Sequence, residues 1–400
     1  ILFWIRIVTL KIMNFGILLL PKINKITVLG SGIMGHGIAQ ISAMNGYDVV
    51  LRDIEERFLD SAMNKIRWSL DKLVEKNKIN KQESDKIHGR IKPIVELKEA
   101  LDDTDLLIEA VPEDLKLKKK VYSEVDQFAQ EKTIYSSNTS TLPISEISQL
   151  TSRPDRFIGL HFFNPPQLMK LVEVIPGAST AESIVDLGIN FVKSLSKDPI
   201  LCNKDVPGFI VNRIFIPLVH EAAYCLDNDS KSMTQIDSAV KFKMYLPMGI
   251  FELADYTGLD VIHRATIEMY SRDKKVVNPH PKIEQLFSSG KYGKKSGDGF
   301  YSYGDKNYER VPLSEEEAKQ YDPIRILSVA INNAAWLISN GVCTREDVEL
   351  ALKLGMGLKK ELFEIGKETG FEKIINTLNQ LVGTNGSFYT PDPYLKTIST

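Results

Sequence analysis

The chain has 400 residues, enough for two or three domains with well-buried apolar cores. Its 50 basic and 52 acidic residues leave a formal net charge of -2, so there is no overall basic surplus to bind nucleic acid. The three cysteines, Cys202, Cys225 and Cys343, show neither disulfide-framework nor metal-ligand spacing, so we expect no metal site and a reducing, cytoplasmic location.

Residues 1–22 are expected to be an N-terminal extension without an assigned structure. They are apolar, but Arg6, Lys11 and Asn14 interrupt them well short of the roughly 18 uncharged residues that a membrane-spanning helix needs. A secretory signal peptide is also disfavoured, because no small-residue cleavage site precedes the first expected strand. Met13 is a candidate for the natural start, and we expect no stable membrane association.

Residues 23–205 show short β-branched runs that alternate with amphipathic segments, which is typical of a parallel sheet covered by helices. The first strand is expected at residues 25–29, the first helix at 33–45 and the second strand at 47–51. Further strands are expected at residues 105–111, 133–137, 156–162 and 171–175. Further helices are expected at residues 58–77, 115–130 and 182–195.

A glycine-rich fingerprint for dinucleotides lies between the first strand and the first helix, at Gly30, Ser31, Gly32, Ile33, Met34 and Gly35. The first glycine permits a tight turn, the second lets the backbone approach a pyrophosphate, and the third allows close helix packing. Asp53 ends the second strand, where a carboxylate accepts ribose hydroxyls and repels a 2'-phosphate. The sequence therefore predicts a Rossmann-type domain that binds NAD rather than NADP.

One histidine and one glutamate follow this fingerprint in the same domain. His161 lies in His-Phe-Phe-Asn-Pro, and Glu173 ends the nearby run Lys-Leu-Val-Glu. A histidine titrates near neutrality, and a carboxylate bonded to its far ring nitrogen fixes the tautomer and stabilises the imidazolium. A proton-transfer pair beside a nicotinamide cofactor predicts oxidation of an alcohol.

The second half of the chain, from Pro207 on, is expected to be helical. Residues 213–283 match residues 325–395 at one fixed offset without a gap, with identities that include Arg213 with Arg325 and Thr257-Gly258 with Thr369-Gly370. We therefore expect two tandem all-α helical domains after the α/β domain: residues 206–305, a linker at 306–320, and a second, degenerate copy at 321–400.

Seven motifs resemble one family together. They are Gly-Ser-Gly-Ile-Met-Gly at residues 30–35, Glu-Ala-Val-Pro-Glu at 109–113, Ser-Asn-Thr-Ser at 137–140, His-Phe-Phe-Asn-Pro at 161–165, Met-Lys-Leu-Val-Glu at 169–173, Pro-Gly-Phe-Ile-Val-Asn-Arg at 207–213 and Gly-Lys-Lys-Ser-Gly-Asp-Gly-Phe-Tyr at 293–301. From Lys25 to about Lys396, the chain resembles the 3-hydroxyacyl-CoA dehydrogenases, of the short-chain type with a duplicated helical domain.

The resemblance implies roles for individual residues. By similarity His161 is the general base, Glu173 orients it, and Ser140 and Asn212 hold the substrate oxygens. The residues expected at the nicotinamide end of the cofactor are Glu113, Lys118, Ser140, Asn164 and Lys295. The residues expected to contact coenzyme A are Ser69, Lys76 and Ser140. The implied activity is NAD-dependent oxidation of (S)-3-hydroxyacyl-CoA to 3-oxoacyl-CoA, on short chains such as 3-hydroxybutyryl-CoA, in fatty acid metabolism.

Other interpretations stay open at this point. Ser140 could cap a helix at residues 144–150, and Lys118 could belong to a solvated helix face. A sugar-acid dehydrogenase of the gulonate type, or a noncatalytic crystallin-like scaffold, would share the fold. The second copy has Ile324 where the first has Asn212, so it cannot form an active site. We expect it to replace a dimer partner, which favours a monomer.

Overall fold

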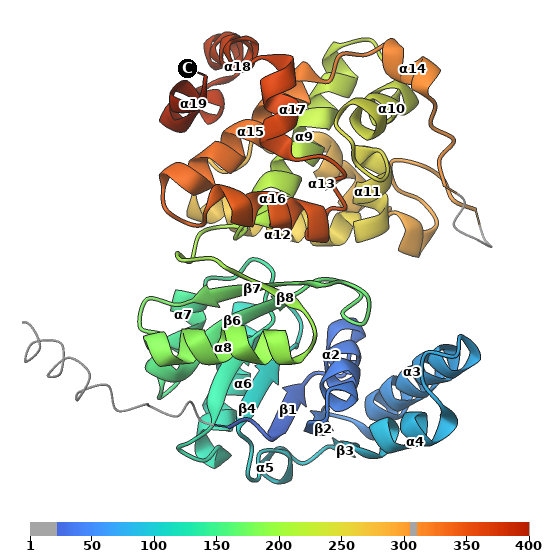
Figure 1. The fold of residues 1–400 in the computed structure, drawn as a ribbon, viewed down its shortest axis with the longest axis vertical. Helices are drawn as coiled ribbons and strands as arrows, with labels where there is room; N and C mark the ends of the chain where they lie inside the picture. Colours follow the sequence, from blue (N-terminus) through green and yellow to red (C-terminus); the bar gives the residue numbers. More distant parts are fainter. Residues whose placement is uncertain (1–21, 305–309, 400) are drawn as a thin grey trace, which may run out of the picture.

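The computed structural model describes residues 22–304 and 310–399. The expected N-terminal extension, with Met13, therefore lies outside the described residues, apart from residue 22. Figure 1 shows two parts, a domain built on a β-sheet and a helical part that lies on one side of it. No helix among the described residues is long and apolar enough to cross a membrane.

The sheet domain has eight strands in the order β3-β2-β1-β4-β5-β6-β7-β8. The strands are β1 (Lys25–Leu29), β2 (Asp48–Arg52), β3 (Ile91–Ile94), β4 (Leu106–Glu109), β5 (Ile134–Ser137), β6 (Phe157–Phe162), β7 (Leu171–Pro176) and β8 (Asp198–Leu201). The helices are α2 (Ile33–Met44), α3 (Glu56–Glu75), α4 (Lys81–Gly89), α5 (Leu97–Ala100), α6 (Leu115–Phe128), α7 (Ile144–Ser148) and α8 (Glu182–Ser194). The predicted strands and helices are thus confirmed, with ends that shift by a few residues.

The sequence did not predict β3 and β8, which form the two edges of the sheet. Each contains a proline, Pro93 in β3 and Pro199 in β8, and each pairs with a neighbour on one side only. Proline lacks the N–H that a central strand needs, so it is tolerated at an edge. The same prolines weaken the strand signal in the sequence.

The expectation of a parallel sheet is wrong at one place. Neighbouring strands pair in parallel except β6 and β7, which are antiparallel. The short connection at residues 163–170 cannot hold the crossover of about a dozen or more residues that parallel neighbours need. The chain therefore turns straight back, and His161 comes to lie directly opposite Glu173.

Apolar side chains fill both faces of the sheet. One cluster joins the sheet to α2, α3 and α8, and includes Ile38, Ile66 and Phe191. The other joins the opposite face to α5, α6 and α7 and continues through Phe209 into the helical part. The second cluster makes the two parts of the molecule one packed body.

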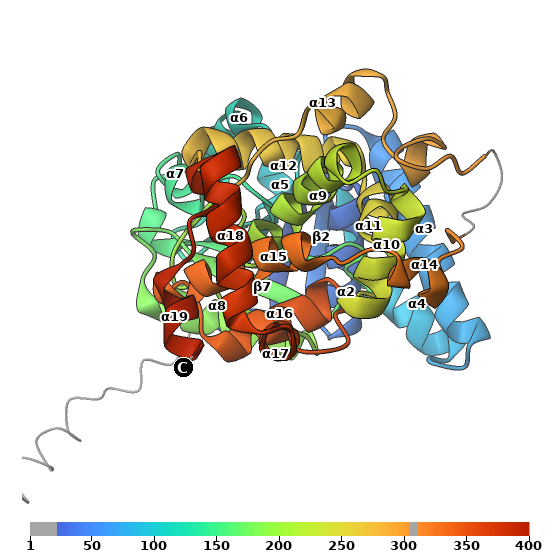
Figure 2. The same ribbon diagram turned by 90° about the horizontal axis from the view of Figure 1, so that it is seen from above.

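The helical part contains two series of helices. The first is α9 (Val211–Asn228), α10 (Met233–Lys243), α11 (Ile250–Thr257), α12 (Leu259–Arg272) and α13 (Pro281–Ser288). The second is α15 (Ile324–Ser339), α16 (Arg345–Gly355), α17 (Leu362–Thr369), α18 (Phe371–Asn385) and α19 (Pro393–Ile398). α15 packs against α9 and α18, as Figure 2 shows from above. The two series share one apolar cluster rather than standing apart.

The two series correspond in detail at the fixed offset found in the sequence. α10 begins with a capping box of Ser232 and Gln235, and α16 begins with the corresponding box of Thr344 and Asp347. Within the linker expected at residues 306–320, α14 (Glu315–Lys319) forms and packs on α10. Three successive glutamates in its first turn favour this short helix, since acidic residues stabilise a helix N-terminus.

His220 offers a test of the packing inside the first series. Burial, together with the charges of His280 and His263, lowers the pKa of His220 to about 3. Its Nδ1 accepts the backbone N–H of His280, and its Nε2 lies 2.8 Å from the Thr266 hydroxyl. The native state therefore keeps this imidazole neutral at pH values where the unfolded chain protonates it.

We predict that the free energy of unfolding falls as the pH falls below about 6.5, because only the unfolded state then binds this proton. Chemical denaturation should show a loss from His220 of about 2 kcal/mol between about pH 7.5 and about pH 5. His220→Asn should be less stable than wild type near neutrality but should lose less on acidification. Equal pH slopes for the two proteins would contradict this account.

Candidate active site

The glycine-rich loop forms a cradle whose three glycines have different surroundings. Gly30 has a positive φ of 94°, and a Cβ built there would lie 2.6 Å from the Ala110 carbonyl oxygen. A Cβ on Gly35 would lie 1.7 Å from the Gly30 carbonyl oxygen. A Cβ on Gly32 would meet nothing within 4 Å, and α2 begins at the next residue. The first and third glycines therefore serve packing, whereas Gly32 leaves open space at a helix N-terminus, where a pyrophosphate fits.

Asp53 follows β2 and turns its carboxylate to this loop. Oδ2 accepts hydrogen bonds from the backbone N–H and from the hydroxyl of Ser31, each at 2.7 Å. Oδ1 accepts the N–H of Ile54 at 2.7 Å. The carboxylate thus lies beside the phosphate cradle, on the strand end where a ribose hydroxyl can reach it.

His161 and Glu173 make the contact that the sequence predicted. His161 Nδ1 lies 2.7 Å from Glu173 Oε2, and both side chains are buried. Because a carboxylate only accepts, Nδ1 carries the proton and Nε2 has a free lone pair. No described residue bonds Nε2, and the rings of Phe163 and Phe209 lie 4.6 and 5.8 Å from the imidazole. The geometry therefore leaves Nε2 as the ring nitrogen that can exchange a proton with a ligand.

The second carboxylate oxygen of Glu173 forms hydrogen bonds with another part of the molecule. Oε1 accepts the backbone N–H groups of Ile210 at 3.2 Å and Val211 at 2.9 Å, at the N-terminus of α9. A helix N-terminus presents free N–H groups and a positive partial charge. Glu173 therefore joins β6 and β7 to the first helix of the helical part.

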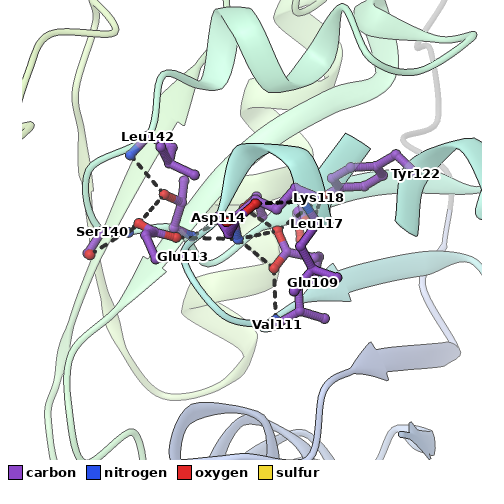
Figure 3. A network of polar contacts seen from close by, with 12 residues as sticks. Glu109, Val111, Glu113, Asp114, Leu117, Lys118, Tyr122, Ser140 and Leu142 are labelled. Atoms are coloured by element: carbon purple, nitrogen blue, oxygen red, sulfur yellow. Dashed lines mark hydrogen bonds and ion pairs between the residues drawn. The ribbon is translucent and has the colours of Figure 1, made fainter. Parts of the chain in front are cut away.

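A network of buried charges lies at the carboxyl ends of β4 and β5 (Figure 3). The ammonium of Lys118 lies 2.6 Å from Glu109 and 3.3 Å from Glu113. Glu113 also accepts the Thr139 hydroxyl at 2.5 Å and the Ser140 N–H at 2.9 Å. Burial alone would raise the pKa of Glu113, but the Lys118 charge and these hydrogen bonds outweigh it and lower the pKa. Burial opposes the charge of Lys118, yet the two carboxylates raise its pKa.

Asn212 links α9 to the loop that carries Ser140. Its side-chain N–H donates to the Ser140 carbonyl at 3.2 Å, and the Ser140 hydroxyl lies 3.3 Å from Glu113. The alternative that Ser140 caps a helix is wrong, because α7 begins after Pro143 and has no side-chain cap. The alternative of a solvated face is wrong for Lys118, which is buried among carboxylates.

Family models match both parts of the chain. The NAD binding domain of 3-hydroxyacyl-CoA dehydrogenase matches residues 25–206, and the C-terminal domain of the same enzymes matches residues 208–303. The chain belongs to the 3-hydroxyacyl-CoA dehydrogenase family. Its cofactor is NAD, and the open space at Gly32 and the carboxylate at Asp53 fit that cofactor.

Individual members of the family resemble the chain over different lengths. Mitochondrial hydroxyacyl-coenzyme A dehydrogenase from Sus scrofa is 40% identical over 288 residues, which are 70% of this chain and 91% of the relative. The structure of (S)-3-hydroxybutyryl-CoA dehydrogenase from Ralstonia eutropha has a TM-score of 0.68 and 35% identity, over 71% of this chain and all of that one.

The 3-hydroxybutyryl-CoA dehydrogenase structure from Escherichia coli has a TM-score of 0.84 and 25% identity, over 95% of this chain and 98% of that one. A match over 95% of the chain has to include helices beyond residue 303, where the family models end. The second helical series therefore has a structural counterpart in that enzyme.

Four of the site residues predicted from the sequence lie outside the group of residues around His161. Asn164 is exposed in the loop between β6 and β7, and Lys295 pairs with Asp260 in the helical part. In α3 the Ser69 hydroxyl accepts from Gln40 of α2, and Lys76 is exposed just past the helix end. Of the predicted residues, the structure thus gathers His161, Glu173, Ser140, Asn212, Glu113 and Lys118.

Sequence reasoning missed Glu109 and Asn138 as site residues. Glu109 accepts a hydrogen bond from the Lys118 ammonium. The Asn138 side-chain oxygen accepts one from the backbone N–H of Phe162, next to His161. Both lie in motifs that the sequence shows, at strand ends in a Rossmann-type domain. That position was the available signal, because the carboxyl ends of parallel strands carry the binding residues. The described residues contain no group of three or more His, Cys, Asp or Glu side chains that could hold a metal.

Replacing Gly32 by alanine tests the cradle. We expect Gly32→Ala to fold with unchanged thermal stability, because its Cβ meets no protein atom. The methyl group would occupy the space of the pyrophosphate, so the NAD dissociation constant should rise by about tenfold or more, equivalent to about 1.4 kcal/mol. Titration of NADH by fluorescence measures this change.

Gly35→Ala is the matched control, because its Cβ would collide with the Gly30 carbonyl. It should reduce thermal stability as well as NAD affinity. The account of the cradle is wrong if Gly32→Ala binds NADH as wild type does.

Proposed function

We propose that this protein oxidises (S)-3-hydroxyacyl-CoA to 3-oxoacyl-CoA and catalyses the reverse reduction, with short acyl chains such as 3-hydroxybutyryl. The observation that carries the proposal is the buried pair of His161 and Glu173 in a domain that binds NAD. The family and the 3-hydroxybutyryl-CoA dehydrogenases to which the chain is similar support it.

His161 acts as the general base in the oxidation. Its Nε2 takes the proton of the 3-hydroxyl group while Nδ1–H stays bonded to Glu173, whose negative charge stabilises the imidazolium that forms. The chemistry that bound NAD would supply is acceptance of the hydride from C3. In the reduction the imidazolium returns its proton to the carbonyl oxygen. The apolar rings of Phe163 and Phe209 keep water away from the imidazole.

Ser140 and Asn212 hold the substrate oxygens. Ser140 lies on the loop beside Glu113, and Asn212 reaches the same loop from α9, so the two side chains approach from opposite domains. Polar donors at such a junction are worth most where water is excluded. Glu113, Lys118, Asn164 and Lys295 are proposed to serve the nicotinamide end of the cofactor.

Coenzyme A is proposed to lie along α3. Ser69 and Lys76 are spaced so that a helix presents both on one face, and Lys76 is exposed. The Ser69 hydroxyl accepts from Gln40, which leaves its own proton available for a ligand. A cytoplasmic location remains part of the proposal, and the three cysteines are buried free thiols.

Two substitutions test the catalytic pair. His161→Gln should lower kcat by about 10³-fold or more, because a general base and its hydrogen bond are lost. Glu173→Gln should lower kcat by about 10²- to 10⁴-fold, since a neutral amide no longer stabilises the imidazolium or fixes its tautomer. The assay is NADH formation from 3-hydroxybutyryl-CoA. NADH affinity should stay within about twofold in both variants, and a loss of NADH binding by His161→Gln would show that the residue has another role.

The second helical series is proposed to be a duplicate of the first that acts as a built-in partner. α15 packs on α9, and the Arg325 guanidinium of α15 pairs with the buried Glu221 of α9. The Tyr389 hydroxyl of the second series donates to the same carboxylate. The face of α9 is therefore covered within one chain.

Light scattering should accordingly give a monomer of about 45.1 kDa. Arg325→Met should weaken the contact with Glu221 and lower thermal stability by several degrees, because the buried carboxylate loses its ion-pair partner and keeps only the Tyr389 hydroxyl. A wild-type dimer formed through α9, with the second series undocked, would refute the built-in partner.

A further inference from the structure

The second helical series touches the strand that carries Glu173. α16 packs against β7 and β8, on the side of the sheet domain that faces the helical part. No residue of α16 belongs to the catalytic set described above. The contact therefore connects the duplicate series, which has no active site of its own, with the active site of the first.

Gly355, the last residue of α16, lies in this contact. A Cβ built on Gly355 would lie 3.0 Å from Leu171 Cδ2 and 3.0 Å from Val211 Cγ2. Leu171 begins β7, the strand of Glu173, and Val211 donates its N–H to Glu173. The backbone of α16 is thus fitted against both elements that hold this carboxylate.

A second contact reaches the first turn of α9. The guanidinium of Arg213 lies 3.3 Å from the ring centroid of Trp336, a residue of α15. Arg213 is buried, and no described residue accepts a hydrogen bond from its Nε or Nη1. The face of the indole is therefore a main compensation for this buried charge. Arg213 directly follows Asn212.

A third contact holds the chain between β8 and α9. The N–H of Asn203 donates to the Val342 carbonyl at 2.7 Å, and the ammonium of Lys204 donates to the Asn340 carbonyl at 2.5 Å. This connection is where the chain passes from the sheet domain to the helical part. The three contacts therefore reach β7, the connection between β8 and α9, and the first turn of α9.

We infer that the second helical series positions the Glu173 carboxylate, with Gly355 and Trp336 as its positioning residues. This inference rests on the proposed function. Glu173 has to lie within hydrogen-bond distance of His161 Nδ1 while its other oxygen keeps two amides, so β7 and α9 must hold a fixed separation. Gly355 sets that separation by contacting both, and Trp336 fixes the turn that bears the second amide.

NAD binding and proton transfer should respond differently to a change in the second helical series. The NAD cradle lies on β1, β2 and α2, whereas α16 packs against α9, α15, β7 and β8. A change at Gly355 should therefore alter the proton transfer and leave NAD affinity unchanged. General weakening of the fold would instead change both.

The experiment compares two alanine substitutions at helical glycines of the second series. Gly355→Ala adds a methyl group against Leu171 and Val211, whereas Gly383→Ala, in α18, adds one where nothing lies within 4 Å. We expect Gly355→Ala to lower kcat about tenfold with the NADH dissociation constant within about twofold, because shifts well below 1 Å at a catalytic group already cost rate. The pH profile of kcat should shift, since the His161 environment changes. Gly383→Ala should match wild type.

Trp336 gives a second, independent variant pair. Trp336→Phe keeps an aromatic face under Arg213 and should retain most of the kcat, while Trp336→Leu should lose about as much as Gly355→Ala. An active wild-type enzyme with Gly355→Ala and Trp336→Leu both within about twofold of Gly383→Ala in kcat and pH profile would overturn the inference alone. A folded wild-type protein without activity on any 3-hydroxyacyl-CoA would overturn the proposed function and this inference with it.

Discussion

The structure depends above all on one buried carboxylate, that of Glu173. An isolated charge in such a place would cost several kcal/mol, and removing one partner of a buried pair typically costs about 3 to 5 kcal/mol. Glu173 avoids that cost with three donors: His161 on β6 and the amides of Ile210 and Val211 at the N-terminus of α9. The same bonds that make its burial tolerable fix the base and join the two parts of the molecule. The proposed catalysis and the interdomain packing therefore share one set of contacts.

Buried acids at helix N-termini recur through the chain. Asp237 accepts the N–H groups of Phe251 and Glu252 at the start of α11. At the corresponding place in the second series, Glu349 accepts those of Leu362 and its neighbour at the start of α17. Each acid satisfies free amides and gains from the helix dipole. The fold thus uses one device repeatedly, and at Glu173 that device also serves the proposed chemistry.

The sequence predicted what local pattern controls. The strand at Lys25, the glycine loop and the cooperation of His161 with Glu173 were all evident, because each depends on residue type and short spacing. The sequence did not predict features that depend on how the strands are arranged in the sheet. Edge strands with Pro93 and Pro199 lack a strong pattern, and the reversal between β6 and β7 follows from a connection too short for a helix. The sequence also left open whether Lys118 lies on a solvated helix face, and the structure shows that it pairs with Glu109 and Glu113.

The two helical series, compared with each other, show which features serve packing and which serve the proposed chemistry. The second series keeps the capping box at Thr344 and the buried acid at Glu349, both of which stabilise helix starts. It has Ile324 at the position of Asn212, the residue whose amide reaches the Ser140 loop. The second series lacks the side-chain amide that contacts the Ser140 loop but keeps the residues that stabilise its helix starts. It can therefore still influence the site through packing. Its α16 lies against β7, so by the inference above the packing of the second series helps to position Glu173. The two series then contribute to one site in different ways.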